Sequence, residues 1–313
     1  MNIVIGSRGS RLALWQANWV GDQLRATGYE VSIEVIRTTG DKLQSYPAAQ
    51  PLPSFMARTV AAAGTKGLFI KEIEEALLAG TVDLAVHSLK DLPTSLPPGL
   101  ILTAVPQRED ARDAFVSGGG ETLEQLPSGA RVGTSSPRRA AQLKHLRPDL
   151  ELIPLRGNLD TRLRKLERGA CAALVLAAAG LHRLDLRERI AGYFSVDQVC
   201  PAVGQGALAI EICRGRAEVE HALAPLDDPA THLAVRAERA LLWRLGGGCQ
   251  VPIAAHANYE DGRMRLRGVV ASPDGSCLLR ASAASSGQNP EDLGVALAEE
   301  LLDQGAAELL NIA

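Results

Sequence analysis

The sequence predicts an α/β protein of two lobes, followed by a small α+β domain. Short apolar runs alternate with amphipathic helical patterns through the first two thirds of the chain, which is typical of βαβ units. In both halves of that region, arginines follow strand-to-helix turns rich in glycine or hydroxyl residues. The last part has a helix, three strands separated by short turns and a final helix, which indicates a separate α+β domain.

The length of 313 residues favours two or three domains over a single core. We expect the first lobe to comprise 1–106 and 207–224, the second lobe 107–206, and the α+β domain 225–313. In this interpretation the chain crosses back to the first lobe at 201–207 and resumes a strand there at 207–212.

The first lobe opens with a strand at 2–5, a Gly/Ser turn at 6–10 and a helix that ends near Gly28. Such a turn presents free backbone N–H groups beside Arg8 and Arg11, so it predicts a carboxylate or phosphate site. An ordinary serine cap explains it equally well. A strand at 29–38 follows, then a proline- and alanine-rich segment at 43–65 interpreted as a mobile loop, and a helix that ends at Gly80.

A third strand, at 82–86, leads directly into His87, Ser88, Lys90 and Asp91. Ligands of open α/β sheets bind beyond the carboxyl ends of strands, so this crowding of polar residues favours a functional site.

The second lobe repeats the arrangement of the first. A strand at 131–133 and a polar turn at 134–136 precede Pro137, which suits a first helical position, and Arg138 and Arg139 follow at once. Further strands are expected at 152–155, before Arg156, and at 172–177. Two such lobes imply a cleft lined for an acidic ligand.

Charge is unevenly distributed along the chain. The segment 138–168 has nine Lys/Arg and four Asp/Glu, although the net charge of the chain is −3. The acidic total argues against a nucleic-acid partner, whereas the local excess favours an anionic ligand. For Arg164, Lys165 and Arg168, a solvated basic face remains the alternative.

The α+β domain contains Cys249, which follows three glycines at 246–248. Without neighbouring Cβ atoms, something bulky can approach or bond to this sulfur, so an attachment point is one interpretation. The other interpretation is that Cys249 is buried as a small apolar side chain just after the end of a helix. Two turns, at 261–262 and 273–275, separate the three strands, and the final helix is expected at 290–310.

The five cysteines form no C-x-x-C pair and no metal-ligand spacing, and their odd number suits a reducing compartment. There is no leader pattern and no apolar run of about 18 residues, which argues against export and a membrane span. We therefore expect a cytoplasmic protein without disulfides, metal ions or a membrane partner.

Nine segments together resemble the porphobilinogen deaminase family over nearly the whole chain. In order they are GSRGSRLALWQA (6–17), KGLFIKEIE (66–74), HSLKDLP (87–93), REDARDAFVS (108–117), VGTSSPRRAAQL (132–143), LRGNLDTRLRKL (155–166), LAAAGLHRL (176–184), PAVGQGALAIE (201–211) and GGGCQVPI (246–253). The resemblance implies two periplasmic-binding-protein-like lobes, a monomer, and a dipyrromethane cofactor bound covalently by a thioether to Cys249. It also implies the activity, in which four porphobilinogen molecules are joined head to tail into hydroxymethylbilane with loss of ammonia.

The resemblance also assigns site residues. Asp91 would contact pyrrole N–H groups, stabilise the cation left when ammonia departs and help protonate the amine, with Lys90 beside it. The other expected cofactor contacts are Lys66, Ser136, Arg138, Arg139, Arg162 and Gln205. The expected substrate contacts are Arg8, Ser10, Gln16, His87, Ser88, Arg156, Arg162 and Arg183.

One stretch departs from the family pattern. Before Lys66 the family usually has a short segment that covers the cleft and ends in Gly-Gly-Lys-Gly, whereas here a longer Ala/Pro-rich segment ends in Gly-Thr-Lys-Gly. We expect residues 43–65 still to act as a lid.

Two rival functions fit parts of the sequence. A hinge-closing binding protein for an acidic small molecule would explain the lobes and arginines but not Cys249. A cysteine acyl-transferase or hydrolase would need a base near the thiol, for which His256 is the nearest histidine in sequence.

Overall fold

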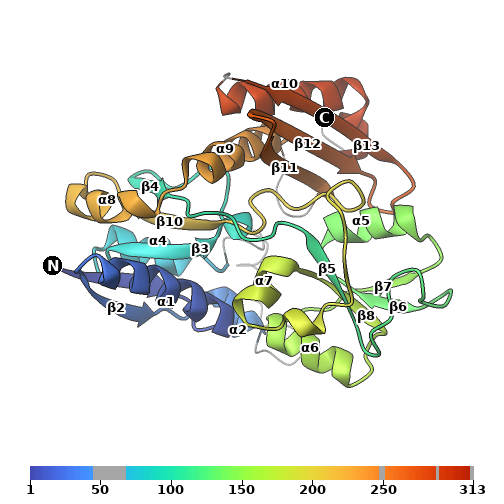
Figure 1. Ribbon diagram of the computed structural model, residues 1–313, viewed down its shortest axis with the longest axis horizontal. Helices are drawn as coiled ribbons and strands as arrows, with labels where there is room; N and C mark the ends of the chain where they lie inside the picture. Colours follow the sequence, from blue (N-terminus) through green and yellow to red (C-terminus); the bar gives the residue numbers. More distant parts are fainter. Residues whose placement is uncertain (45–67, 247–250, 287–288, 311–313) are drawn as a thin grey trace, which may run out of the picture. The chain divides into compact units, whose positions relative to one another are not determined.

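The computed structural model describes residues 1–44, 68–246, 251–286 and 289–310 (Figure 1). The chain divides into two compact units. One is Met1–Gln107 with Leu208–Asp228, and the other is Arg108–Ala207 with Pro229–Ala313. The predicted fold class is confirmed, because the first unit contains one five-stranded sheet and the second contains a five-stranded and a three-stranded sheet. The division of the second unit into two domains stays a proposal.

The first unit is a twisted sheet with helices on both faces. Its sheet order is β2-β1-β3-β10-β4, in which β1 is parallel to β2 and β3, and β10 is antiparallel to β3 and β4. The elements are β1 (Asn2–Ser7), α1 (Arg11–Ala26), β2 (Glu30–Val35), α2 (Thr39–Gln44), α4 (Lys71–Leu78), β3 (Leu84–Ser88), β4 (Leu100–Ala104), β10 (Leu208–Cys213) and α8 (Ala217–Leu223).

Apolar side chains of the helices fix this sheet on both faces. Val20 and Leu24 of α1 share one hydrophobic core with Ile210 of β10. Ile73 and Leu77 of α4 belong to a second hydrophobic core, which includes Ala85 of β3. Ile73 and Leu77 are each 1% exposed, and burial of such a side chain contributes about 1.5–3 kcal/mol. The strand expected at 207–212 corresponds to β10, which pairs with β3, and the assignment of this segment to the first lobe stays a proposal.

The second unit begins with a sheet of order β7-β6-β8-β5-β9, in which β5 is antiparallel to β8 and β9. Its elements are β5 (Asp113–Ser117), β6 (Arg131–Gly133), α5 (Pro137–Leu146), β7 (Glu151–Ile153), α6 (Leu159–Glu167), β8 (Ala173–Ala177), α7 (Ala178–Arg183) and β9 (Gly192–Tyr193). The predicted turn before α5 is confirmed, since Ser136 caps the helix and Pro137 is its first residue.

The rest of the second unit is an antiparallel sheet of order β11-β12-β13 with two long helices packed against it. Its elements are α9 (Pro229–Arg244), β11 (Ile253–Glu260), β12 (Arg263–Ala271), β13 (Leu278–Ser285), α10 (Pro290–Asp303) and α11 (Ala306–Leu310). The single final helix expected at 290–310 is wrong. Gly305, with φ of 98°, separates α10 from α11.

Two other expectations are corrected by the structure. His87 and Ser88 belong to β3 itself rather than to the turn after it. β4 (LILTA) and β5 (DAFVS) are strands that the sequence analysis did not predict.

Candidate active site

Lys90 and Asp91 lie in a short 3-10 turn, η1 (Leu89–Asp91), at the carboxyl end of β3. Leu89 is 1% exposed and anchors the turn, whereas Asp91 is exposed and Lys90 is half-buried. The turn therefore presents a carboxylate and an ammonium group at the end of a buried central strand, where ligands of such sheets bind.

The two polar residues of β3 are held by side chains from other elements. His87 Nε2 lies 3.1 Å from Oε2 of Glu211 on β10, and both side chains are buried. The Ser88 hydroxyl accepts a 2.8 Å hydrogen bond from Nε2 of Gln16, which is buried on α1. His87 and Gln16 therefore act within the fold as anchors of the strand end.

The turn after β1 holds Arg8 and Ser10. Ser10 caps α1, since its hydroxyl accepts from the backbone N–H of Ala13. Arg8 donates from Nε to Oδ1 of Asp41 at 3.1 Å, and its guanidinium carbon lies 4.2 Å from the centre of the Phe69 ring. Burial alone would raise the pKa of Asp41, but hydrogen bonds from Arg8 and Thr38 outweigh it and lower that pKa. Arg8 is thus already paired with a carboxylate.

In the second lobe, Arg138 and Arg139 share one carboxylate, that of Asp113. The Nη2 atoms of the two arginines lie 2.7 Å from Oδ2 and Oδ1 respectively, and Gln205 Nε2 donates to Oδ1 at 2.9 Å. Asp113 is 0% exposed, and the arginines are 4% and 6% exposed. Two guanidinium groups against one carboxylate leave a buried positive excess.

Electrostatics agree with this arrangement. Burial opposes ionisation of Asp113, but the charges of Arg138 and Arg139 prevail and lower its pKa to about 2. Burial also lowers the pKa of Arg138, and within the described residues its Nε atom has no hydrogen-bond partner. A carboxylate bound there would receive a charge-assisted hydrogen bond from a group already taken out of water.

The other predicted arginines differ in burial. Arg183 is 9% exposed, donates to the Gly206 carbonyl at 2.7 Å, and has a pKa lowered by burial to about 10. Arg162 is half-buried and donates from Nε to the Gly157 carbonyl at 2.8 Å. Arg156 is exposed at the turn before α6.

The backbone at Gly206, whose carbonyl accepts from Arg183, requires glycine. Gly206 has φ of 88°, and a Cβ there would overlap the Glu109 carbonyl oxygen, so only glycine fits.

Two predicted residues, Cys249 and Lys66, lie outside the described residues, as does most of the segment 43–65. His256, the base required by the cysteine-hydrolase alternative, is 9% exposed, and burial lowers its pKa to about 4. A histidine with such a pKa is neutral at physiological pH but only weakly basic, which disfavours that alternative.

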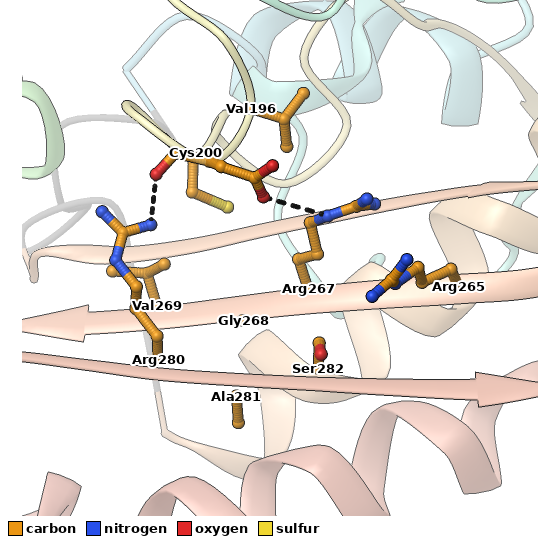
Figure 2. A pocket seen from close by; sticks show the side chains of 10 residues that line it. Val196, Cys200, Arg265, Arg267, Gly268, Val269, Arg280, Ala281 and Ser282 are labelled. Carbon is orange, nitrogen blue, oxygen red and sulfur yellow. Dashed lines mark hydrogen bonds and ion pairs between the residues drawn. The ribbon is translucent and has the colours of Figure 1, made fainter.

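A pocket of about 320 Å³ lies over β12 and β13, and none of the predicted site residues that the structure describes lines it (Figure 2). It is lined by Arg265, Arg267 and Arg280, together with the segment around Cys200. Arg267 pairs with Asp197 at 3.3 Å, and Arg280 donates to the backbone carbonyl of Asp197 at 2.7 Å. Its guanidinium groups thus hold the neighbouring loop.

Three buried carboxylates in the two units were not identified from the sequence: Asp113, Glu211 and Glu238. Glu238 on α9 accepts from both Nη atoms of Arg108 and from the backbone N–H groups of Gly204 and Ala257. A charged residue within an apolar run, as in the β10 sequence LAIEIC, was the available signal.

Arginine-rich turns in two α/β lobes, with a carboxylate exposed at a strand end, define a protein that binds and acts on an acidic small molecule. Family models agree in detail. The one described as "Porphobilinogen deaminase, dipyromethane cofactor binding domain" matches residues 3–221, and the one for the C-terminal domain matches 232–303.

Curated relatives match over nearly their full length. The porphobilinogen deaminase of Syntrophotalea carbinolica is 52% identical over 98% of this chain and 94% of its own. Those of Syntrophobacter fumaroxidans and Desulforudis audaxviator are 51% and 53% identical over 99% and 98% of this chain, and 97% and 96% of their own.

Solved structures resemble the chain only weakly. An ancestral arginine-binding protein bound to arginine is 13% identical, with a TM-score of 0.37, over 72% of this chain and 90% of its own. We infer nothing from a similarity this weak, and the fold is assigned from the sheets described above.

The chain belongs to the porphobilinogen deaminase family. Its activity is the transferase reaction of tetrapyrrole biosynthesis that forms hydroxymethylbilane from porphobilinogen, with a dipyrromethane cofactor. The residues present fit that cofactor, because its carboxylates suit the buried positive excess around Asp113 and the Nε of Arg138, which has no hydrogen-bond partner among the described residues. In the part of the chain that the structure describes, no helix is long and apolar enough to cross a membrane.

Proposed function

We propose that Asp91 is the carboxylate that acts on the substrate, with Lys90 as its neighbour in the same turn. The observation that carries this proposal is the exposure of Asp91 at the carboxyl end of β3, beside anchors that keep the turn in place. Asp91 accepts hydrogen bonds from pyrrole N–H groups, stabilises the positive charge that develops as ammonia leaves, and helps protonate the departing amine.

The carboxylates of cofactor and substrate bind the arginines, because guanidinium groups stay charged and pair with carboxylates through two hydrogen bonds. We assign the cofactor to Arg138, Arg139, Arg162, Ser136, Gln205 and Lys66, with Lys90 and Asp91. We assign the substrate to Arg8, Ser10, Gln16, Arg156, Arg162, Arg183, His87 and Ser88. Of these, His87 and Gln16 are buried and paired within the fold, so they act on the substrate through the position of the strand end.

The covalent link is assigned to the sulfur of Cys249. When bound, the cofactor supplies the primer to which the first substrate unit is joined. The intact mass of the purified protein should exceed the mass of the chain by two linked pyrrole units, and Cys249→Ala should fold yet show the mass of the chain alone. Cofactor mass retained in that variant would move the link to another residue.

The test of Asp91 is the Asp91→Asn variant. We expect a native fold and an intact cofactor bond, with turnover reduced by orders of magnitude because the developing cation loses its counter-charge. Hydroxymethylbilane formation is measured beside Asp22→Asn, a matched change at an exposed aspartate of α1 that pairs only locally with Arg25. Near-normal turnover of Asp91→Asn would remove Asp91 from the mechanism.

We also propose that the protein works as a monomer in the cytoplasm, without nucleic acid. The acidic net charge of −3 supports the absence of nucleic acid, and the odd cysteine count supports the cytoplasm. Light scattering measures the molar mass of the purified protein in solution. A mass twice that of the chain would contradict the monomer.

A further inference from the structure

Three ionisable side chains lie together behind the strand that carries the candidate site, and the proposed function uses only one of them. His87 on β3 and Glu211 on β10 are 6% and 0% exposed, and the half-buried Glu74 lies on α4, which packs on both strands. Glu211 pairs with Ala85, which shares a core with Ile73 of α4, so Glu211 lies on the face of the sheet that α4 covers. A buried charge is costly unless it is paired, so a cluster of two carboxyl groups and one imidazole requires an explanation.

Two oxygen atoms of this cluster are unsatisfied. Glu211 uses Oε2 for His87, while its Oε1 is buried and, within the described residues, has no hydrogen-bond partner. Glu74 Oε1 is in the same condition. Buried polar atoms in native proteins are almost always hydrogen-bonded, and one proton held between two carboxyl groups would satisfy both oxygens.

The charge balance favours such a proton. Burial, and then the charge of Glu211, raise the pKa of Glu74 to about 7, while His87 acts in the opposite direction. Of the elements packed against α4, β1 and β4 contain no ionisable side chain. Besides Glu74 itself, the charged or titratable groups on α4, β3 and β10 are Lys71, Glu72, Glu75, His87, Glu211 and Cys213.

We propose that Glu74, Glu211 and His87 form a proton-holding triad that positions the turn with Lys90 and Asp91. Glu74 donates its proton to Oε1 of Glu211, and Oε2 of Glu211 accepts from Nε2–H of His87. Glu74 and Glu211 are positioning residues that act through His87 and do not touch the substrate.

The consequence for catalysis follows from the place of His87. His87 is held from the α4 side of the sheet, and its neighbour Ser88 is held by Gln16 from α1, so both faces of the strand end are anchored. Only Leu89 and Lys90 separate Ser88 from Asp91. A small displacement of the turn would misplace the carboxylate, and errors of about 1 Å can cost about a hundredfold in rate. This inference rests on the proposed role of Asp91.

The first experiment detects the proton without turnover. Infrared difference spectra of the intact holoenzyme, between about pH 6 and about pH 8, should show a protonated carboxyl band lost as pH rises through about 7. Glu74→Gln should lack that band, whereas Glu75→Gln should retain it, because Glu75 lies on the exposed side of α4 and pairs with Lys71. A band that persists in Glu74→Gln, or its absence from the unmodified protein, would overturn the triad.

The second experiment separates positioning from a purely structural role. We expect Glu211→Gln to keep the cofactor by intact mass, to bind porphobilinogen with KM within about twofold, and to lose at least about tenfold in kcat. Glu75→Gln should match the unmodified protein in both constants. Unchanged kcat in Glu211→Gln would overturn the inference while leaving Asp91 in place, whereas normal kcat in Asp91→Asn would refute the proposed function itself. If Glu211→Gln does not fold, the infrared comparison of Glu74→Gln with Glu75→Gln decides whether the triad exists.

Discussion

The two lobes place charge in opposite ways behind similar strand-to-helix architecture. In the first lobe, the groups behind the turn are the buried Glu211 and His87 and the half-buried Glu74, and the exposed residue is Asp91. In the second lobe, Arg138 and Arg139 are buried around the single carboxylate of Asp113. The first lobe therefore has a buried acidic surplus and the second a buried basic surplus.

This difference indicates a division of labour between the lobes. A basic surplus taken out of water is suited to bind carboxylates, since Arg pairs with them bidentately and loses little charge on burial. An exposed carboxylate on an anchored turn is suited to stabilise a transient cation.

The largest effect is expected for Asp113→Ala. Removal of this carboxylate leaves two buried guanidinium groups unpaired, and breaking a buried pair in this way typically costs about 3–5 kcal/mol. Denaturant unfolding measures the loss. The control is Asp110→Ala, whose partner Arg112 has a side chain that is 43% exposed, and it should cost less than about 1 kcal/mol. Equal costs for the two variants would show that the basic surplus is held by something else.

A smaller effect is expected for Arg139→Met, which keeps the apolar stem and removes the charge. Asp113 would still be paired with Arg138 and bonded by Gln205, so the expected cost is about 1–3 kcal/mol, as for the loss of a charge-assisted hydrogen bond. The variant should also retain less cofactor by intact mass. Arg112→Met is the matched control, and full cofactor occupancy in Arg139→Met would remove Arg139 from the cofactor contacts.

The opposite surpluses predict opposite pH dependence. The pKa of Asp113 is lowered from 3.8 to about 2, so its contribution to stability is present above about pH 4 and is lost as pH falls toward 2. The pKa of Glu74 is raised from 4.5 to about 7, so its contribution is full below about pH 4.5 and is lost as pH rises through 7. For the half-buried Glu74 this amounts to about 1–2 kcal/mol.

Thermal unfolding followed across pH tests this sign. Glu74→Gln should abolish the decline in stability between about pH 4.5 and 7, and Glu75→Gln should preserve it. If the stability of Glu74→Gln still declined over this pH range, a group other than Glu74 would be responsible for the pH dependence.

Local signals in the sequence predicted the turns well. The serine cap and first-position proline before Arg138 need only neighbouring residues to be recognised, and the structure confirms them. The apolar runs likewise predicted most strands. Their exact ends were missed, because His87 and Ser88 have polar side chains but pair with β10 as part of the strand.

The partners of the buried charges could not be predicted in this way. Asp113 pairs with Arg139, which is 26 residues away in the sequence, and His87 contacts Glu211, which is 124 residues away. Which carboxylate neutralises which cation depends on how strands pair across the sheet, and sequence periodicity does not contain that pairing. The sequence could indicate only that a charge such as Glu211, inside an apolar strand, must have some partner.

The smallest effect on stability is expected at Asp91, the residue proposed to act on the substrate. Asp91 is exposed, so Asp91→Asn should change the free energy of unfolding by no more than about 0.5 kcal/mol. Denaturant unfolding of this variant, set beside that of Asp113→Ala, separates a carboxylate kept for chemistry from one that neutralises buried arginines. If Asp91→Asn were as destabilised as Asp113→Ala, its loss of turnover would reflect damage to the fold, and the contrast between the two lobes would fail.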